Sequence, residues 1–537
     1  MVRESHKHNV LLLFSLAIIL GTAGLYASLL YGWLRRPQSS GVSAPARSND
    51  ALQTARQDFR DRFLYPEAWL RLSQALFANG RPIDSFYVME GARQFFGDDA
   101  FRRAHEDVVL KREPGLETTG EDDEASLRRR LQDDPNDPPV IVALADIEFR
   151  SGRVAEAQSL LDTSLGAHPS DRALLFEKAL QTLDPMQSIP FYAQAVHAGP
   201  KTYEGIKSLE ALKVIASEPD DGPRGEAASL AREALQELLK AHPKEPSILD
   251  ALGLALLNSG HRSTAQALAQ EAAHKGDATG AAVLDGALAL KDNDVDFAIR
   301  RLTAAWEADP GNAYASEKLA EIYDLQRGEP EAALPYYIAL YRLEPFREEG
   351  AEPLEHVIRR ILDARRQQLL ADVPASGLGH FLNSDDASLR AEACVRAAVL
   401  KDPRWIDVLA GLLDDDTEIV RHNADYALYQ LAKIYPDAIL VRRDDWLARS
   451  GFLERARVLN LFADLWPKTT WPLVQKALYS QNPALRYLVK TMILDNYYRG
   501  DAAVAKAKAD YLSQENDPRV LALFKRDQML ESQSRRR

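Results

Sequence analysis

The stretch SILDALGLALLNSGHRSTAQALAQEAAH, residues 247–274, decides the fold of this chain. Its first half carries large apolar residues three or four positions apart, and its second half is rich in alanine. Such spacings place side chains on one face of an α-helix, and a glycine between the halves is typical of a turn. The stretch therefore predicts two helices joined by a tight turn. The residues that form the pattern are Leu249, Leu252, Gly253, Leu256, Gly260, Ala265 and Ala272.

The same order of large residue, small residue, loop, alanine and closing proline recurs over residues 61–346, with a period of roughly 34 residues. A single hairpin of helices cannot bury its apolar face alone, so it must stack on copies of itself. The period therefore predicts an array of hairpins rather than one compact core. Further members of the pattern are Trp69, Leu72, Ala92, Leu144, Gly152, Ala157, Pro169, Gly286, Ala305, Pro310, Leu319, Ala320, Ala339 and Pro345.

This pattern resembles the tetratricopeptide repeat (TPR) family. The resemblance implies a superhelix whose concave face, lined by first-helix positions, binds other proteins. Chaperone-binding members hold a C-terminal carboxylate with lysines and asparagines, which this chain does not match, so an extended or helical peptide is the favoured ligand. An acidic stretch near 98–135 interrupts the period and is interpreted as a solvated loop. The concave-face positions map to Leu70, Gln74, Phe77, Val142, Asp146, Phe149, Asp250, Leu254, Leu257, Tyr314, Glu317 and Glu321.

A second repeat pattern occupies residues 377–530. It follows a basic connecting helix or linker at 347–376 and precedes a basic tail at 531–537. Arginines recur at intervals of a little over thirty residues, and acidic or amide-rich turns often precede them. This resembles the short HEAT repeats of bacterial proteins and of the bilin-lyase family, although nothing beyond the repeat supports bilin attachment. We interpret the arginines as structural, each donating hydrogen bonds to a neighbouring turn. They are Arg390, Arg421, Arg455, Arg486 and Arg519.

Residues 10–34 contain no charged side chain. About 25 residues at roughly 1.5 Å each exceed the thickness of a hydrocarbon core, and a cleaved signal peptide would have a shorter apolar region. We therefore predict a tail at 1–9, a transmembrane anchor at 10–34 that contacts the lipid bilayer, and a linker at 35–60. Gly24, Ser28 and Gly32 form a stripe of small residues that suits helix packing in lipid.

The flanking charges hardly favour either orientation of this anchor, because Arg3 and Lys7 precede it and Arg35 and Arg36 follow it. The single cysteine, Cys394, favours an exported body. The predicted localisation is the bacterial inner membrane, single-pass, with the large domain in the periplasm.

Several function classes are disfavoured by the composition. The net charge of -13 argues against nucleic-acid binding, which needs clustered Lys and Arg. One cysteine cannot form an intrachain disulfide or a thiolate zinc site. The chain has no phosphate-binding loop, zinc-protease helix, nucleophile elbow or calcium loop. We therefore expect no catalytic residues, no cofactor, no metal and no small-molecule substrate.

The sequence thus predicts an all-α protein: a TPR-like helical-hairpin solenoid followed by a HEAT-like α-solenoid and preceded by one transmembrane helix. The favoured function is a membrane-tethered, non-catalytic scaffold or adaptor for proteins of a cell-envelope complex, since a shared membrane raises effective concentration. One alternative is a permanent structural subunit of a membrane enzyme or electron-transfer complex. Another is a cytoplasm-facing regulator that resembles the lipopolysaccharide-assembly TPR proteins, although this chain lacks the cysteine pairs of their rubredoxin-like domain.

Overall fold

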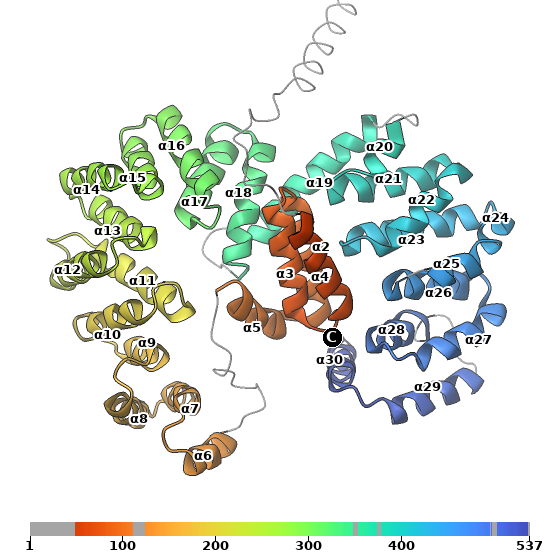
Figure 1. Ribbon diagram of the computed structural model, residues 1–537, viewed down its shortest axis with the longest axis horizontal. Coiled ribbons are helices and arrows are strands. Elements are labelled where there is room, and N and C mark those ends of the chain that lie inside the picture. Colours follow the sequence, from red (N-terminus) through yellow and green to blue (C-terminus); the bar gives the residue numbers. More distant parts are fainter. Residues whose placement is uncertain are drawn as a thin grey trace, which may run out of the picture. The chain divides into compact units, whose positions relative to one another are not determined.

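The computed structural model describes residues 49–110, 124–346, 353–372, 377–449, 451–494, 496 and 502–534. Within these ranges all regular structure is helical, and consecutive helices pair as hairpins (Figure 1). This confirms the predicted all-α, TPR-like helical-repeat architecture. The predicted anchor at 10–34, with Gly24, Ser28 and Gly32, lies outside the described residues. The range predicted as a linker, 35–60, overlaps helix α2, which begins at Asn49.

The predicted localisation as a single-pass inner-membrane protein is contradicted. No helix in the described ranges is both long enough and apolar enough to cross a bilayer. The physical reason is visible in α19, Leu354–Asp372, which is 19 residues long but carries Arg359, Arg360 and Asp363. A spanning helix needs about 20 predominantly apolar residues, and charges at this density are incompatible with hydrocarbon.

The first array consists of paired helices that begin and end with local signals. Proline occupies a first helical position at Pro138, Pro246 and Pro330, where its missing N–H is not needed. Gly260 adopts φ +90° between α13 and α14, a conformation that suits glycine. The helices are α6 Glu124–Asp133, α7 Pro138–Arg150, α8 Val154–Ala167, α9 Arg172–Gln181, α10 Pro185–Ala198, α11 Tyr203–Ala216, α12 Gly225–Ala241, α13 Pro246–Asn258, α14 Arg262–His274, α15 Ala278–Lys291, α16 Val295–Ala308, α17 Ala313–Glu321, η1 Ile322–Gln326 and α18 Pro330–Leu343.

Small residues in this array allow helices to approach closely. A Cβ on Gly253 of α13 would lie 2.3 Å from Leu284 Cδ2 of α15, in the next hairpin. A Cβ on Gly286 of α15 would lie 2.6 Å from Leu302 Cγ of α16, its hairpin partner. Glycine therefore serves both contacts, within a hairpin and between successive hairpins.

The second array has shorter and more irregular first helices. Its core contains the buried Cys394, Trp446 and Phe462. The helices are α20 Leu378–Leu382, α21 Ala387–Leu400, η3 Pro403–Trp405, α22 Ile406–Gly411, η4 Leu412–Asp414, α23 Glu418–Ala432, α24 Pro436–Leu440, α25 Arg443–Arg449, α26 Phe452–Leu465, α27 Pro467–Leu478, α28 Pro483–Leu488, η5 Val489–Leu494, α29 Ala502–Gln514 and α30 Pro518–Ser534.

The N-terminal helices pack against parts of the chain that are distant in sequence. They are α2 Asn49–Asp61, α3 Pro66–Ala78, α4 Pro82–Phe96 and α5 Asp98–Val108. Helix α4 contacts α18 on one side and α21 and α23 on the other, as can be followed in Figure 1. One hydrophobic cluster joins Phe86 of α4 with Tyr341 of α18 and Leu459 of α26. The first hairpin thus does not simply begin a linear series.

Charged contacts accompany this packing. The fully buried Asp84 carboxylate of α4 accepts hydrogen bonds from Arg81 Nη2 at 2.6 Å, from Arg390 Nη2 at 2.7 Å and from the Ala387 backbone N at 3.0 Å. Glu90 of α4 accepts hydrogen bonds from the Tyr341 hydroxyl and from Arg359. Carboxylates of one helix therefore join both arrays and the connecting helix α19.

Candidate functional site

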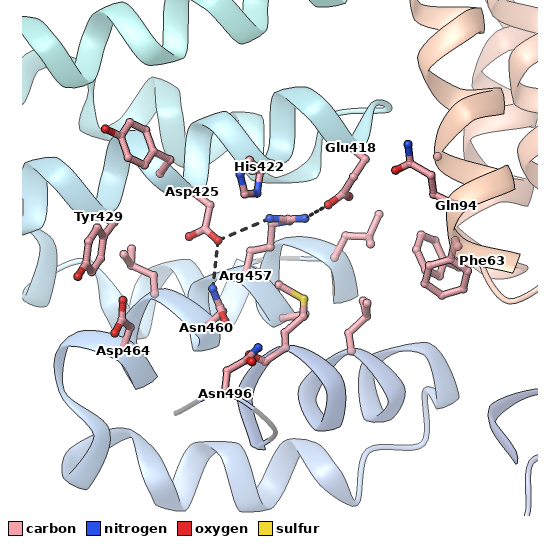
Figure 2. Close-up of a pocket in the computed structure, with 18 of the residues that line it drawn as sticks. Phe63, Gln94, Glu418, His422, Asp425, Tyr429, Arg457, Asn460, Asp464 and Asn496 are labelled. Atoms are coloured by element: carbon pink, nitrogen blue, oxygen red, sulfur yellow. Dashed lines mark hydrogen bonds and ion pairs between the residues drawn. The ribbon is translucent and has the colours of Figure 1, made fainter. Parts of the chain in front are cut away.

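A cleft of about 610 Å³ lies where the N-terminal helices meet the second array, and we call it the junction cleft. Its walls come from α3 and α4, from α23 and α26, and from η5 and α30. Figure 2 shows Gln94 of α4 and Phe63 of the turn between α2 and α3 opposite Glu418 at the start of α23. Side chains that are more than 400 residues apart thus line one surface, from Phe63 to Arg526.

A charged network forms the α23–α26 wall of this cleft. Arg457 of α26 donates to Glu418, and its Nη1 lies 3.5 Å from Asp425 Oδ2 (Figure 2). Asn460 Nδ2 donates to the same Asp425 oxygen at 3.1 Å. Arg457 and Asn460 are three residues apart on α26, and Glu418 and Asp425 are seven residues apart on α23, so each pair shares one helix face. The network fixes the wall before any ligand arrives.

Two carboxylates of the network have opposite pKa shifts. Burial raises the pKa of Asp425 to about 6, even though Arg457 and the Asn460 amide act to lower it. Desolvation would also raise the pKa of Glu418, but Arg457 and Arg421 outweigh it and hold that pKa below its usual value. The junction cleft therefore contains one carboxyl group that titrates slightly below neutral pH.

Aromatic groups form a further part of the cleft surface. Trp69 Nε1 donates to the Phe63 carbonyl at 2.8 Å, and the Trp69 ring stacks on Phe95 with ring centroids 5.7 Å apart. A Cβ on Gly91 would lie 3.0 Å from the Trp69 ring, so glycine permits this approach. Tyr426 lines the cleft with 47% of its surface exposed.

The sequence-predicted concave-face residues do not line the junction cleft. In the first hairpin, Leu70 is buried, Gln74 Nε2 donates to the Val108 carbonyl at 3.4 Å, and Phe77 lies under the Arg342 guanidinium at 4.0 Å. These three side chains therefore contact other parts of the same chain.

Val142, Asp146 and Phe149 are brought together. They line a second cleft of about 500 Å³, formed by the first helices of three successive hairpins, α7, α9 and α11. We call it the α7–α11 cleft.

The remaining predicted positions lie farther along the array. Leu254 and Leu257 are buried with Asp250, whose Oδ2 accepts a hydrogen bond from Asn312 Nδ2 at 2.8 Å. Burial raises the pKa of Asp250 to about 8. Tyr314, Glu317 and Glu321 are half-exposed or exposed on α17, where the two glutamates accept hydrogen bonds from Lys318 at 3.1 and 2.8 Å.

Three of the predicted HEAT arginines share one geometry. In each, a guanidinium Nη1 donates to the carbonyl six residues earlier: Arg390 to Ser384 at 2.8 Å, Arg421 to Asp415 at 2.5 Å and Arg486 to Ser480 at 2.8 Å. Arg390 and Arg486 also bind a carboxylate in the following turn. Arg390 pairs with Asp415, and Arg486 pairs with Glu515.

The other two arginines differ from each other in register. Arg455 follows the N-cap residue Gly451 by four positions, as Arg390 follows Asp386. Arg519 is only the second residue of α30 and pairs locally with Asp517.

Sequence reasoning missed the residues of the junction cleft. The repeat pattern marks which residues pack within a hairpin, but the cleft depends on contacts between distant hairpins. A usable signal is the acidic triplet before α23. Asp415 accepts from Arg390 of the preceding repeat, whereas Asp416 and Asp414 accept from Arg56 and Arg60 of α2 at 2.8 Å. Three acidic residues in one turn exceed what one neighbouring arginine can satisfy.

Across the described ranges, no group of three or more His, Cys, Asp or Glu side chains is placed to hold a metal ion. Burial raises the pKa of the Cys394 thiol well above its usual value, so the thiolate is disfavoured. The Arg457 network is internally paired and presents no activated nucleophile.

Comparison with known proteins adds little. No protein-family model and no curated protein matches this chain. A solved structure of Naa15/Naa10 bound to HypK-THB is similar over 78% of this chain and 63% of that chain, at 16% identity and a TM-score of 0.26. This chain thus spans less than two thirds of the chain it matches, and a superposition this loose carries no functional argument.

Proposed function

We propose that this protein is a non-catalytic scaffold that binds an amphipathic polypeptide segment of a partner protein in the junction cleft. The observation that carries the proposal is the composition of that cleft: an exposed Tyr426, apolar Leu488 and Met492, and polar Gln94 and Asn496 around a wall fixed by Arg457. Tyrosine, methionine and arginine are enriched where proteins bind proteins. An amphipathic segment offers apolar side chains to the floor and polar groups to the rim.

The form of the second array supports the same role. We infer that residues 377–530 are HEAT-like, because Arg390, Arg421 and Arg486 repeat one contact with the preceding turn. Stacked arrays create long surfaces from many repeats and suit the binding of extended partners.

Site-specific photo-cross-linking tests the proposal. A photoreactive phenylalanine analogue replaces Tyr426 in the full chain, and the matched control carries it at Val441, which is 77% exposed outside the cleft. We expect a polypeptide adduct of defined mass from position 426 and none from 441. The cross-linked peptide should map to an amphipathic segment. Equal cross-linking at both positions, or none at 426 in the cell that produces the protein, overturns the proposal.

A further inference from the structure

The α7–α11 cleft shares no lining residue with the junction cleft and has a different chemistry. Its walls are the first helices of three consecutive hairpins, which contact one another in the order α7, α9, α11 (Figure 1). Three aromatic rings line it, Phe149, Phe176 and Tyr203. The rings of Phe176 and Tyr203 meet edge to face with centroids 6.1 Å apart. Aromatic faces of this kind attract cations as well as apolar groups.

Two buried acceptor atoms on this cleft lack hydrogen-bond donors in the described part of the chain: Gln181 Oε1 and Glu204 Oε2. Both residues line the cleft and are only 2% exposed. The Gln181 amide is oriented by its own Nε2, which donates to Glu177 Oε1 at 2.7 Å. The nearest cation to Glu204 Oε2 is Arg172 Nε at 3.5 Å, an ion pair without a hydrogen bond. Buried acceptors in this state are destabilising unless a donor is supplied.

The charges on the cleft have one predominant sign. Three carboxylates line it, those of Asp146, Glu177 and Glu204, while the cations beside them are Arg150, which lines the cleft, and Arg172, which lies 3.5 Å from Glu204. The Arg150 guanidinium already pairs with Asp146 at 2.8 Å. A ligand that carried a carboxylate would be repelled, whereas one that carried several N–H donors and a positive charge would satisfy the acceptors.

We propose that the α7–α11 cleft binds an arginine side chain of a partner polypeptide. A guanidinium has five donors in a planar fork, stacks on aromatic rings and remains charged at any physiological pH. Its donors reach Gln181 Oε1 and Glu204 Oε2, while its plane lies against Phe176 or Tyr203. The positions that the repeat pattern marks as binding residues, Val142, Asp146 and Phe149, form one wall of this site.

Fluorescence anisotropy with two labelled peptides tests this site on the full chain. The probe is a Gly/Ser dodecapeptide with three spaced arginines, and its partner carries citrulline, which is neutral and nearly isosteric, at the same positions. We expect the arginine peptide to bind at least about ten-fold more tightly at physiological salt. Equal binding of the two peptides overturns the proposal.

Variants separate a local site from the general acidity of the chain. Glu204→Gln should weaken the arginine peptide about ten-fold, since it removes a charge-assisted hydrogen bond. Glu156→Gln, on the exposed surface of α8, makes the same change in net charge and should leave binding unaltered. If the two variants weaken binding equally, attraction is non-specific and the proposal fails.

A third variant covers the case in which Glu204→Gln does not fold. Asp146→Asn changes a half-exposed residue, frees Arg150 to repel the ligand, and should weaken the arginine peptide about three-fold or more. Unchanged binding in this variant also overturns the proposal. Because the junction cleft has separate residues, the cross-linking result at Tyr426 stands or fails independently.

Discussion

The two arrays pack successive repeats in different ways. In α13–α16 the helices touch through glycine and alanine, so that Leu284 and Leu302 fill space that a single Cβ would occupy. In the second array the contact from α21 to the next turn passes through the Arg390 guanidinium, which is 4% exposed and bound by Asp415. The first kind of contact is sensitive to added atoms and the second to removed ones. Substitutions that remove the guanidinium in the second array or add a carbon in the first array test this difference.

The largest effect is expected for Arg390→Met. This change leaves the buried Asp415 carboxylate without its guanidinium partner and leaves the buried Asp84 carboxylate with Arg81 alone. Removing one member of a buried ion pair typically lowers stability by about 3–5 kcal/mol. The measurement is the free energy of the first unfolding transition in urea. Arg404→Met removes an exposed arginine that pairs with Asp402 and should leave that transition unchanged. Equal effects would show that burial is irrelevant to this contact.

Next in size is Gly253→Ala, which adds one carbon in the first array. The new Cβ would lie 2.3 Å from Leu284 Cδ2, and overpacking of this kind costs about 1–3 kcal/mol. Gly166→Ala, in α8 with no atom within 4 Å of its Cβ position, is the matched control. It should instead stabilise by up to about 1 kcal/mol, because alanine favours helix. Urea unfolding of both variants gives the sign directly, and a stable Gly253→Ala would refute the close approach.

A smaller effect should distinguish the arrays by pH. Burial raises the pKa of Asp250 in the first array to about 8 and that of Asp425 in the second to about 6. A carboxyl group whose pKa is higher in the folded state than its unfolded value of 3.8 stabilises the folded state at low pH. This stabilisation is complete below pH 3.8 and is lost as the pH rises through the pKa of the folded state. The stability of Asp425→Asn relative to wild type should therefore increase with pH and level off at about pH 6. The relative stability of Asp250→Asn should continue to increase until about pH 8.

Melting temperatures of the three proteins between pH 4 and pH 9 check this order. The difference between each variant and wild type is the informative quantity, because it cancels the titration of all other groups. Difference curves that level off at the same pH would contradict the assignment of the two environments.

The smallest perturbation uses Cys394 as a reporter of the second array. It is the only cysteine of the chain and is fully buried on α21, where its thiolate is disfavoured. A thiol reagent should therefore label it only when the second array opens. Labelling should accelerate in Arg390→Met and remain slow in Gly253→Ala. Equal acceleration in both variants would indicate that the two arrays open together.

The sequence predicted the hairpins well, because each is specified by local residues. Pro246 begins α13, Gly260 turns the chain and Ala265 packs inside α14, all within one period. The same local information located Val142, Asp146 and Phe149 together on one cleft. Leu70 and Phe77 of the same predicted set have different surroundings: Leu70 is buried, and Phe77 lies under the guanidinium of Arg342, which is distant in sequence.

The junction cleft could not be predicted from periodicity. Its residues become neighbours only through contacts such as Arg526 with the Phe95 carbonyl and Arg390 with Asp84. A repeat pattern describes how a hairpin meets the next one in sequence and is silent on hairpins that meet across hundreds of residues. The predicted membrane localisation failed for a different reason: it rested on residues 10–34 alone, and no helix of the described ranges is both long enough and apolar enough to cross a membrane.

The position of α4 has a consequence for the growing chain on the ribosome. Asp84 is translated about 300 residues before Arg390, its buried partner. Until the second array leaves the exit tunnel, Asp84 has Arg81 as a partner but lacks Arg390 and the Ala387 backbone N–H. The nascent amino-terminal helices therefore complete this buried contact only after the carboxyl-terminal half is made, and we expect protection by a chaperone during that interval to raise the yield of native protein.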